Sequence, residues 1–235
     1  MRRLPILLIF TLVIRMTSFA QCEGGLSWDF DEQENQGFSI GKFFTETFTP
    51  KLIVDTRRIR AYIRDPRFKE LTTRCGDLRA VDGIYLKALK IADFNISRAL
   101  FLSLMGTLEH ENVAFKIPVV GALHVPLTFE ADSLFKARIM NLPSRIYPDT
   151  PPEGDRDKLQ HFFASAYLSY VSEAPELAKE SGDLVEWSEA RFIVGGADDP
   201  RDKRSNKHGD AFGRDLAVVK TLLPSDYLHL PKGQK

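Results

Sequence analysis

The sequence predicts an α+β protein that is mostly α-helical, with a small β-hairpin in its front half and a helical C-terminal half. Apolar residues recur at helical spacing through most of the chain. Residues 112–128 alternate instead between apolar and polar, which is the period of a strand. Residues 143–156 contain four prolines and read as a linker between a helical region at 51–142 and a second one at 157–235.

The composition excludes several classes of protein. The chain has 235 residues, 32 Lys and Arg, 32 Asp and Glu, 43% hydrophobic residues and two cysteines. A disordered chain would have fewer apolar residues, a nucleic-acid binder would be basic, and a disulfide scaffold would be rich in cysteine. We therefore expect a globular protein with no nucleic-acid partner.

Residues 1–20 have the pattern of a signal peptide. Arg2 and Arg3 precede an apolar run over Leu4–Ile14, and Ser18 and Ala20 are the small residues that a signal peptidase requires before its cut. The run is shorter than the roughly 20 apolar residues of a spanning helix, although an uncleaved anchor stays open as the alternative. The segment predicts that the protein is exported and is periplasmic or secreted. Association with the outer envelope is one of the locations that this prediction includes.

The segment 21–50 reads as a polar arm rich in aromatic residues. Cys22 lies at its start and Cys75 is the other cysteine of the chain. An oxidising compartment permits a disulfide between them, and two free thiols are the alternative that the sequence leaves open. The order Phe19-Ala20-Gln21-Cys22 lacks the pattern of a lipoprotein signal.

The front half is basic and helical. Residues 51–90 contain 11 basic and 5 acidic residues, an excess that suits an anionic membrane surface or an envelope component as partner. Acids interleaved at helical spacing favour paired, solvated helix faces instead. The apolar pattern over 81–108 predicts two helices divided near Asp93-Phe94-Asn95, with Asn95 or Ser97 as cap. After the hairpin, a short helix is expected over Asp132–Met140.

The back half contains the candidate chemistry. Asp157, His161 and Ser165 follow one another at intervals of four, so they share one face of the predicted helix. On this geometry Asp157 can orient the imidazole of His161, which makes these two the candidate catalytic residues.

Two further helices are expected to complete this site. Glu186 and Glu189 lie three residues apart in a helix predicted over 184–194. A helix after Asp199-Pro200 places Asp202, Asn206, Gly209 and Gly213 on one face. Because glycine is unfavourable inside a helix, the two glycines predict close approach of another helix, and the one that carries His161 is the plausible partner.

Packing of these helices would gather carboxylates around one histidine. Glu186, Glu189, Asp202 and Asn206 are the candidate ligands of a divalent metal. A buried hydrogen-bond network that fixes the packing of the helices is the other interpretation of the same residues. Whether the protein is an enzyme is left open at this point.

Three motifs in order resemble a known family. They are Asp157-Lys158-x-x-His161, Glu186-x-x-Glu189, and Asp202-x-x-x-Asn206-x-x-Gly209. The set resembles the pattern of VanZ-like proteins and is similar to YfiM-type predicted periplasmic lipoproteins, over about residues 155–216. Glu189 stands where the family has Gln, and the chain lacks the long apolar segments of VanZ-like helices. The resemblance implies a bacterial cell-envelope location and assigns no reaction.

Two functions are therefore expected from the sequence. The leading one is an exported cell-envelope protein that binds or supports other components, with a polar Asp/His/Glu/Asn site at which its helices pack. The alternative is a metal-assisted envelope hydrolase that uses His161 and the surrounding carboxylates.

Overall fold

The computed structural model describes residues 51–109, 112–117, 121–126, 130–173 and 199–228. In the two short ranges, 112–117 and 121–126, it describes the backbone alone. The expected signal peptide, the aromatic arm and the expected helix over 184–194 lie outside these residues.

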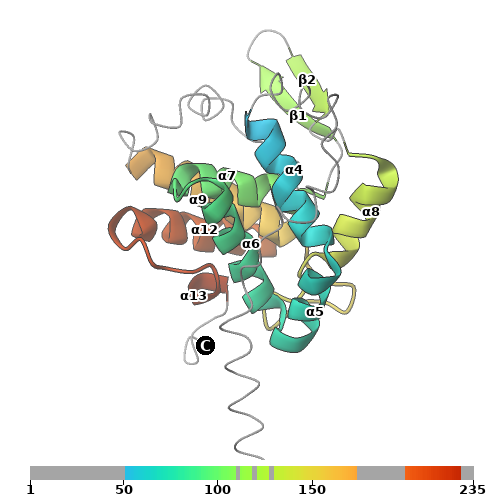
Figure 1. Ribbon diagram of the computed structural model, residues 1–235. Helices are drawn as coiled ribbons and strands as arrows, with labels where there is room; N and C mark the ends of the chain where they lie inside the picture. Colours follow the sequence, from blue (N-terminus) through green and yellow to red (C-terminus); the bar gives the residue numbers. More distant parts are fainter. Residues whose placement is uncertain (1–50, 110–111, 118–120, 127–129, 174–198, 229–235) are drawn as a thin grey trace, which may run out of the picture.

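The described chain is a packed set of helices with one short ribbon (Figure 1). The helices of the front half are α4 (Lys51–Arg64), α5 (Pro66–Cys75), α6 (Asp77–Ile91) and α7 (Ile96–Thr107). The ribbon consists of β1 (Asn112–Ile117) and β2 (Gly121–Pro126), and α8 (Asp132–Asn141) follows it. The back half consists of α9 (Asp157–Glu173), α12 (Pro200–Val218) and α13 (Ser225–Leu228).

Helix α7 is the centre of the core. Ten of its twelve residues are buried, as expected of a helix that is apolar on all sides. Two of its buried hydroxyls are satisfied within the helix, because Ser103 donates to the carbonyl of Ala99 and Thr107 to that of Ser103, at 2.8 and 2.9 Å. Helices α4, α6 and α9 all pack against α7, and α9 in turn packs against α12. One core therefore joins the front half to the back half.

The fold class predicted from the sequence is wrong, since the part of the chain that the structure describes in full is all-α. Helices make up 76% of the residues that the structure describes in full, and no strand occurs among those residues. The strands β1 and β2 pair antiparallel, with Asn112 opposite Pro126 and Ile117 opposite Gly121. The ribbon lies at the upper edge of the molecule in Figure 1, whereas α13 lies in its lower part. Alternation in one stretch indicates a local strand, but the class depends on what forms the core, and the described core consists of residues from helices and their connections.

Helix boundaries follow capping residues. Asn95 begins α7, where its side chain accepts from the backbone N–H of Arg98 at 3.0 Å. The expected break between two helices is thus confirmed, and Asn95 is the cap. Asp65 and Asp199 cap α5 and α12 in the same way, each followed by a proline in the first turn.

The proline-rich segment 143–156 packs on the core and does not act as a spacer. Ile146 and Tyr147 are buried in the same core as the helices around them. The carboxylate of Asp77 accepts from the backbone N–H of Ser144 at 2.8 Å, which ties the segment to the start of α6. This segment therefore positions Asp155, its last buried residue, next to the start of α9.

Helix α8 is held by a buried group of charges. Arg138 is fully buried and donates from Nη1 to the carbonyls of Gly106 and Leu108, at 2.9 and 2.8 Å, where α7 ends. Its Nε donates to Glu130 at 3.0 Å, and Arg64 also donates to Glu130. Cations at the carbonyl end of a helix are favourable, so this group caps α7 while it fixes α8.

In the part of the chain that the structure describes, none of the helices has the length and apolar character needed to cross a membrane.

Candidate functional site

The candidate site lies where α9 and α12 begin side by side. A Cβ atom on Gly209 would lie 2.1 Å from the carbonyl oxygen of Phe162, and one on Gly213 would lie 2.2 Å from that of Ala166. The expected close approach to the His161 helix is confirmed. Both pairs have the same offset of 47 residues as Lys158 and Ser205, whose hydroxyl donates to the Lys158 carbonyl at 2.6 Å. The constant offset shows that the helices run parallel, so their N-termini meet at one end.

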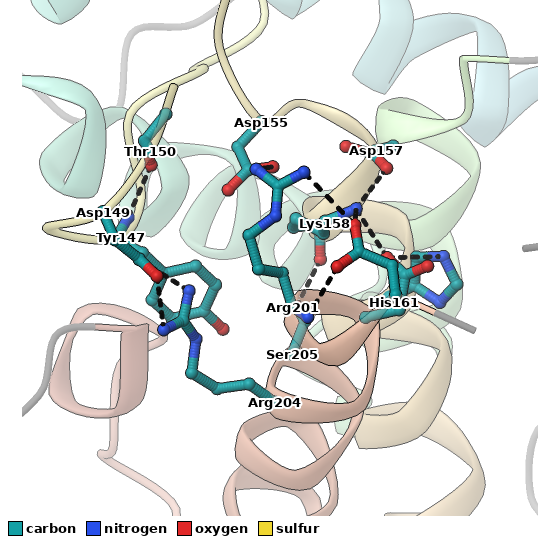
Figure 2. Close-up of polar contacts among 12 residues, drawn as sticks. Tyr147, Asp149, Thr150, Asp155, Asp157, Lys158, His161, Arg201, Arg204 and Ser205 are labelled. Carbon is teal, nitrogen blue, oxygen red and sulfur yellow. Dashed lines mark hydrogen bonds and ion pairs between the residues drawn. The ribbon is translucent and has the colours of Figure 1, made fainter. Parts of the chain in front are cut away.

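The ammonium group of Lys158 is the centre of this site. Its Nζ lies 2.5 Å from Asp157 Oδ2, 2.6 Å from Asp202 Oδ1 and 3.1 Å from Asp199 Oδ2. The side chain of Lys158 is only 2% exposed, although the residue lies in the first turn of α9. Figure 2 shows it pointing between Asp157 and the neighbouring helix. One cation therefore links carboxylates of α9 and α12, a set that we call the Lys158 cluster.

A second cation extends the cluster to the segment before α9. Arg201 donates from Nη1 to Asp155 Oδ1 at 3.0 Å and from Nη2 to Asp199 Oδ2 at 3.2 Å. Further along α12, Arg204 pairs with Asp149 at 2.7 Å and stacks on the ring of Tyr147 (Figure 2). Two arginines near the start of α12, Arg201 and Arg204, thus each hold a carboxylate of the proline-rich segment, and the loop and the helix become one polar surface.

The protonation states are set by burial and by these contacts. Burial alone would lower the pKa of Lys158, but hydrogen bonds to Asp157, Asp202 and Asp199 outweigh it and hold the pKa well above its usual value. The backbone N–H of Arg201 lowers the pKa of Asp199 to about 2, with Lys158 and the Arg201 side chain adding to the effect. Burial raises the pKa of Asp155, although Arg201 and Lys158 oppose it. At neutral pH the cluster therefore contains a charged lysine.

His161 lies beside the cluster with a different partner from the one expected. Its Nε2 is 3.4 Å from Asp202 Oδ1 on α12, and the residue is 8% exposed. Among the described contacts none joins His161 to Asp157, because Lys158 holds the Asp157 carboxylate. The expectation that Asp157 orients His161 is corrected by this geometry, and Asp202 is the carboxylate next to the imidazole.

The predicted metal ligands are only partly brought together. Asp202 is in the cluster, whereas Asn206 accepts a hydrogen bond from Ser165 at 3.1 Å within the helix–helix contact. Glu186 and Glu189 lie outside the described residues. Among the residues that the structure does describe, no group of three or more His, Cys, Asp or Glu is arranged to hold a metal ion.

Sequence reasoning missed Lys158, Arg201, Asp199 and Asp155 as members of the site. Asp199 carried a usable signal, since an Asp-Pro pair before a helical pattern is typical of a helix start. Lys158 entered the sequence argument only through the Asp157-Lys158-x-x-His161 motif, because lysine is almost always exposed and its burial here requires the packing of α12 against α9.

The cysteine pairing is described at one of its two ends. Cys75, the last residue of α5, is disulfide-bonded. Cys22, the other of the two cysteines in the chain, lies outside the described residues.

The low pKa of Asp199 predicts a loss of stability in acid. A carboxylate whose pKa falls from 3.8 to about 2 on folding stabilises the protein above pH 4, and this contribution disappears as the pH falls through 2. Asp199→Asn keeps the helix cap but removes the charge. We expect the variant to melt below the wild type at neutral pH and together with it near pH 2, as measured by circular dichroism. A melting difference that stays constant from neutral pH to pH 2 would contradict this assignment.

Comparisons with known proteins give no match: no family model matches the chain, and no curated protein or solved structure gives a significant match. The resemblance to VanZ-like proteins therefore depends on the three motifs alone and stays a hypothesis.

Proposed function

We propose that this chain is an exported cell-envelope protein of the binding or structural kind, in which the Lys158 cluster locks α9 against α12. The observation that carries the proposal is the position of the Lys158 ammonium, within 3.1 Å of three carboxylates from the two helices. A cation of the protein itself already occupies the place between these carboxylates that an ion or a cationic substrate group would take.

The remaining contacts along the two helices support a locking role. Phe162, one helical turn after Lys158 in α9, stacks on Phe212 with ring centroids 5.4 Å apart. The glycines allow backbone contact, and the Ser165–Asn206 hydrogen bond lies on the same interface. Parallel helices have aligned dipoles, and acids at their shared N-terminal end are favourable for that reason. Apolar packing, backbone contact and charge thus all favour one arrangement of the helices.

Export is supported by the N-terminal sequence and by Cys75. The leader pattern over residues 1–20 directs a chain out of the cytoplasm, and a disulfide-bonded Cys75 fits an oxidising compartment. The mature protein would then begin near Gln21 and fold where the disulfide can form.

The proposal is tested by the variants His161→Ala and Asp202→Asn in the mature chain. If the cluster is structural, Asp202→Asn destabilises the protein by about 2–3 kcal/mol because Lys158 loses its most buried partner. His161→Ala should lower stability less, and a chelator should leave the melting temperature unchanged. Urea unfolding and elemental analysis of the purified protein are the measurements. Asp210→Asn, in a half-exposed pair with Arg214 on the same helix, is the matched control and should change stability little.

A metal-assisted hydrolase built on His161 predicts the opposite pattern. The purified protein would contain a stoichiometric divalent metal, and His161→Ala would lose that metal while its melting temperature stayed near that of the wild type. This result would overturn the structural proposal and favour the alternative.

A further inference from the structure

The turn between α6 and α7 has an unusual backbone for its sequence. Asp93 and Phe94 both have positive φ, at 53° and 63°, in a region that glycine adopts easily. Aspartate tolerates this conformation, but for a bulky side chain such as phenylalanine it is an outlier. Strain of this kind persists where the surrounding structure fixes it, and it is concentrated at functional positions.

The surrounding hydrogen bonds do fix this turn. The N–H of Phe94 donates to the carbonyl of Leu89 at 2.8 Å, and the N–H of Asn95 donates to that of Ala92 at 3.0 Å. Asn95 then caps α7. The turn is therefore a rigid helix-to-helix corner in which glycine would meet the backbone demand better than phenylalanine.

The side chain of Phe94 gains nothing from the core in return. It is 77% exposed, the highest exposed fraction of any aromatic side chain among the described residues. An aromatic ring that is exposed at a strained, rigid corner is not explained by the fold.

Basic residues surround this corner. Lys51, at the start of α4, lies 3.0 Å from Asp93, with the two side chains 59% and 80% exposed. The hydrogen bond from Lys51 lowers the pKa of Asp93, and Arg98 and Arg58 add to the effect. Beneath them Asp55 is buried and bonded to Arg98. With the exposed Lys90 in the last turn of α6, the described residues of this corner comprise four cations and two carboxylates.

We propose that the α6–α7 corner docks the protein on an anionic lipid surface, with Phe94 entering the interface and the surrounding cations facing the headgroups. A projecting aromatic ring within a basic surface is the arrangement by which proteins lie on such membranes. It also gives a role to Lys51, Arg58 and Lys90, three basic residues of the range 51–90 that lie outside the Lys158 cluster. The proposal is independent of the function proposed for that cluster.

Phe94→Gly separates this role from a structural one. Glycine relieves the backbone strain, so the melting temperature should rise by a few degrees. The same change removes the exposed ring that enters the lipid interface, so partition of the mature protein onto vesicles of phosphatidylcholine and phosphatidylglycerol in equal parts should fall at least about tenfold. Co-sedimentation measures the partition. Lys51→Gln should weaken it to a smaller extent, and raised salt should weaken it in the wild type.

Two comparisons make the result specific. Met140→Ala removes an equally exposed apolar side chain from α8, away from the corner, and should leave the partition unchanged. Vesicles of phosphatidylcholine alone should bind the wild type weakly. If Phe94→Gly gains stability but still sediments with the anionic vesicles as the wild type does, the corner is not the docking site and the proposal is overturned. Equal binding to the neutral vesicles would overturn it as well.

Discussion

Gly209→Ala and Gly213→Ala are each expected to destabilise the protein by about 3 kcal/mol or more, the upper part of the range for overpacking. A Cβ at either position would lie within 2.2 Å of a backbone carbonyl oxygen on α9. A flexible side chain could move away from the new atom, but a helical carbonyl cannot move without the whole of α9. The two helices would have to separate, and the neighbouring contacts between α9 and α12 would weaken. Urea unfolding of each variant measures the loss.

The sign of this effect is informative, because an exposed helical glycine behaves in the opposite way. Replacing it by alanine stabilises a helix by about 1 kcal/mol through propensity alone. Lys207→Ala, at an exposed position of α12 two residues before Gly209, is the control and should stay within about 0.5 kcal/mol of the wild type. A stabilising Gly209→Ala would mean that the helices do not touch at this point.

Lys158→Met is the second change with a large expected effect, a loss of about 3 kcal/mol at neutral pH. Methionine fills the volume of the aliphatic part of the lysine side chain but leaves three carboxylates without their shared cation. Asp202 contributes most of the loss, since its side chain is 12% exposed, whereas those of Asp157 and Asp199 are 41% and 27% exposed and are partly screened by water. Equilibrium unfolding at neutral pH measures the loss, with Lys207→Met as the exposed control.

Two further measurements distinguish the lost charge from lost packing. Without the ammonium group, the remaining carboxylates bind protons more tightly in the folded state, so the deficit of the variant should shrink as the pH is lowered toward 4. The double variant Lys158→Met with Asp202→Asn should recover part of the loss, because the uncompensated charge is removed. A deficit that is independent of pH and additive in the double variant would assign the effect to packing and refute the ion cluster.

The sequence predicted those features of the fold that depend on local chemistry. The break before α7 and its Asn95 cap follow from a polar residue ahead of an apolar run, and α12 begins at the proline of the Asp199-Pro200 pair. Gly209 and Gly213 indicated close approach because glycine in a helix interior is unfavourable without such a reason. The fold class could not be obtained in this way, since alternation over 112–128 is a local signal and the composition of the core is a global property.

The candidate site shows the same division. Spacing of four placed Asp157 and His161 on one face of α9, and this periodicity is a property of any helix. It could not say that α12 would arrive parallel to α9, bring Asp199 and Asp202 to the same end, and enclose Lys158. Once it does, the lysine takes the Asp157 carboxylate and His161 is left beside Asp202.

The sequence by itself thus determined where α7 and α12 begin and which residues of α12 approach another helix closely. Only the tertiary structure decided which charged side chains form ion pairs with one another. Local patterns specify the conformation and the face of each segment, but ion pairs between distant segments depend on the register of their packing. In this protein that register is set by two glycines on one helix against two carbonyls of another.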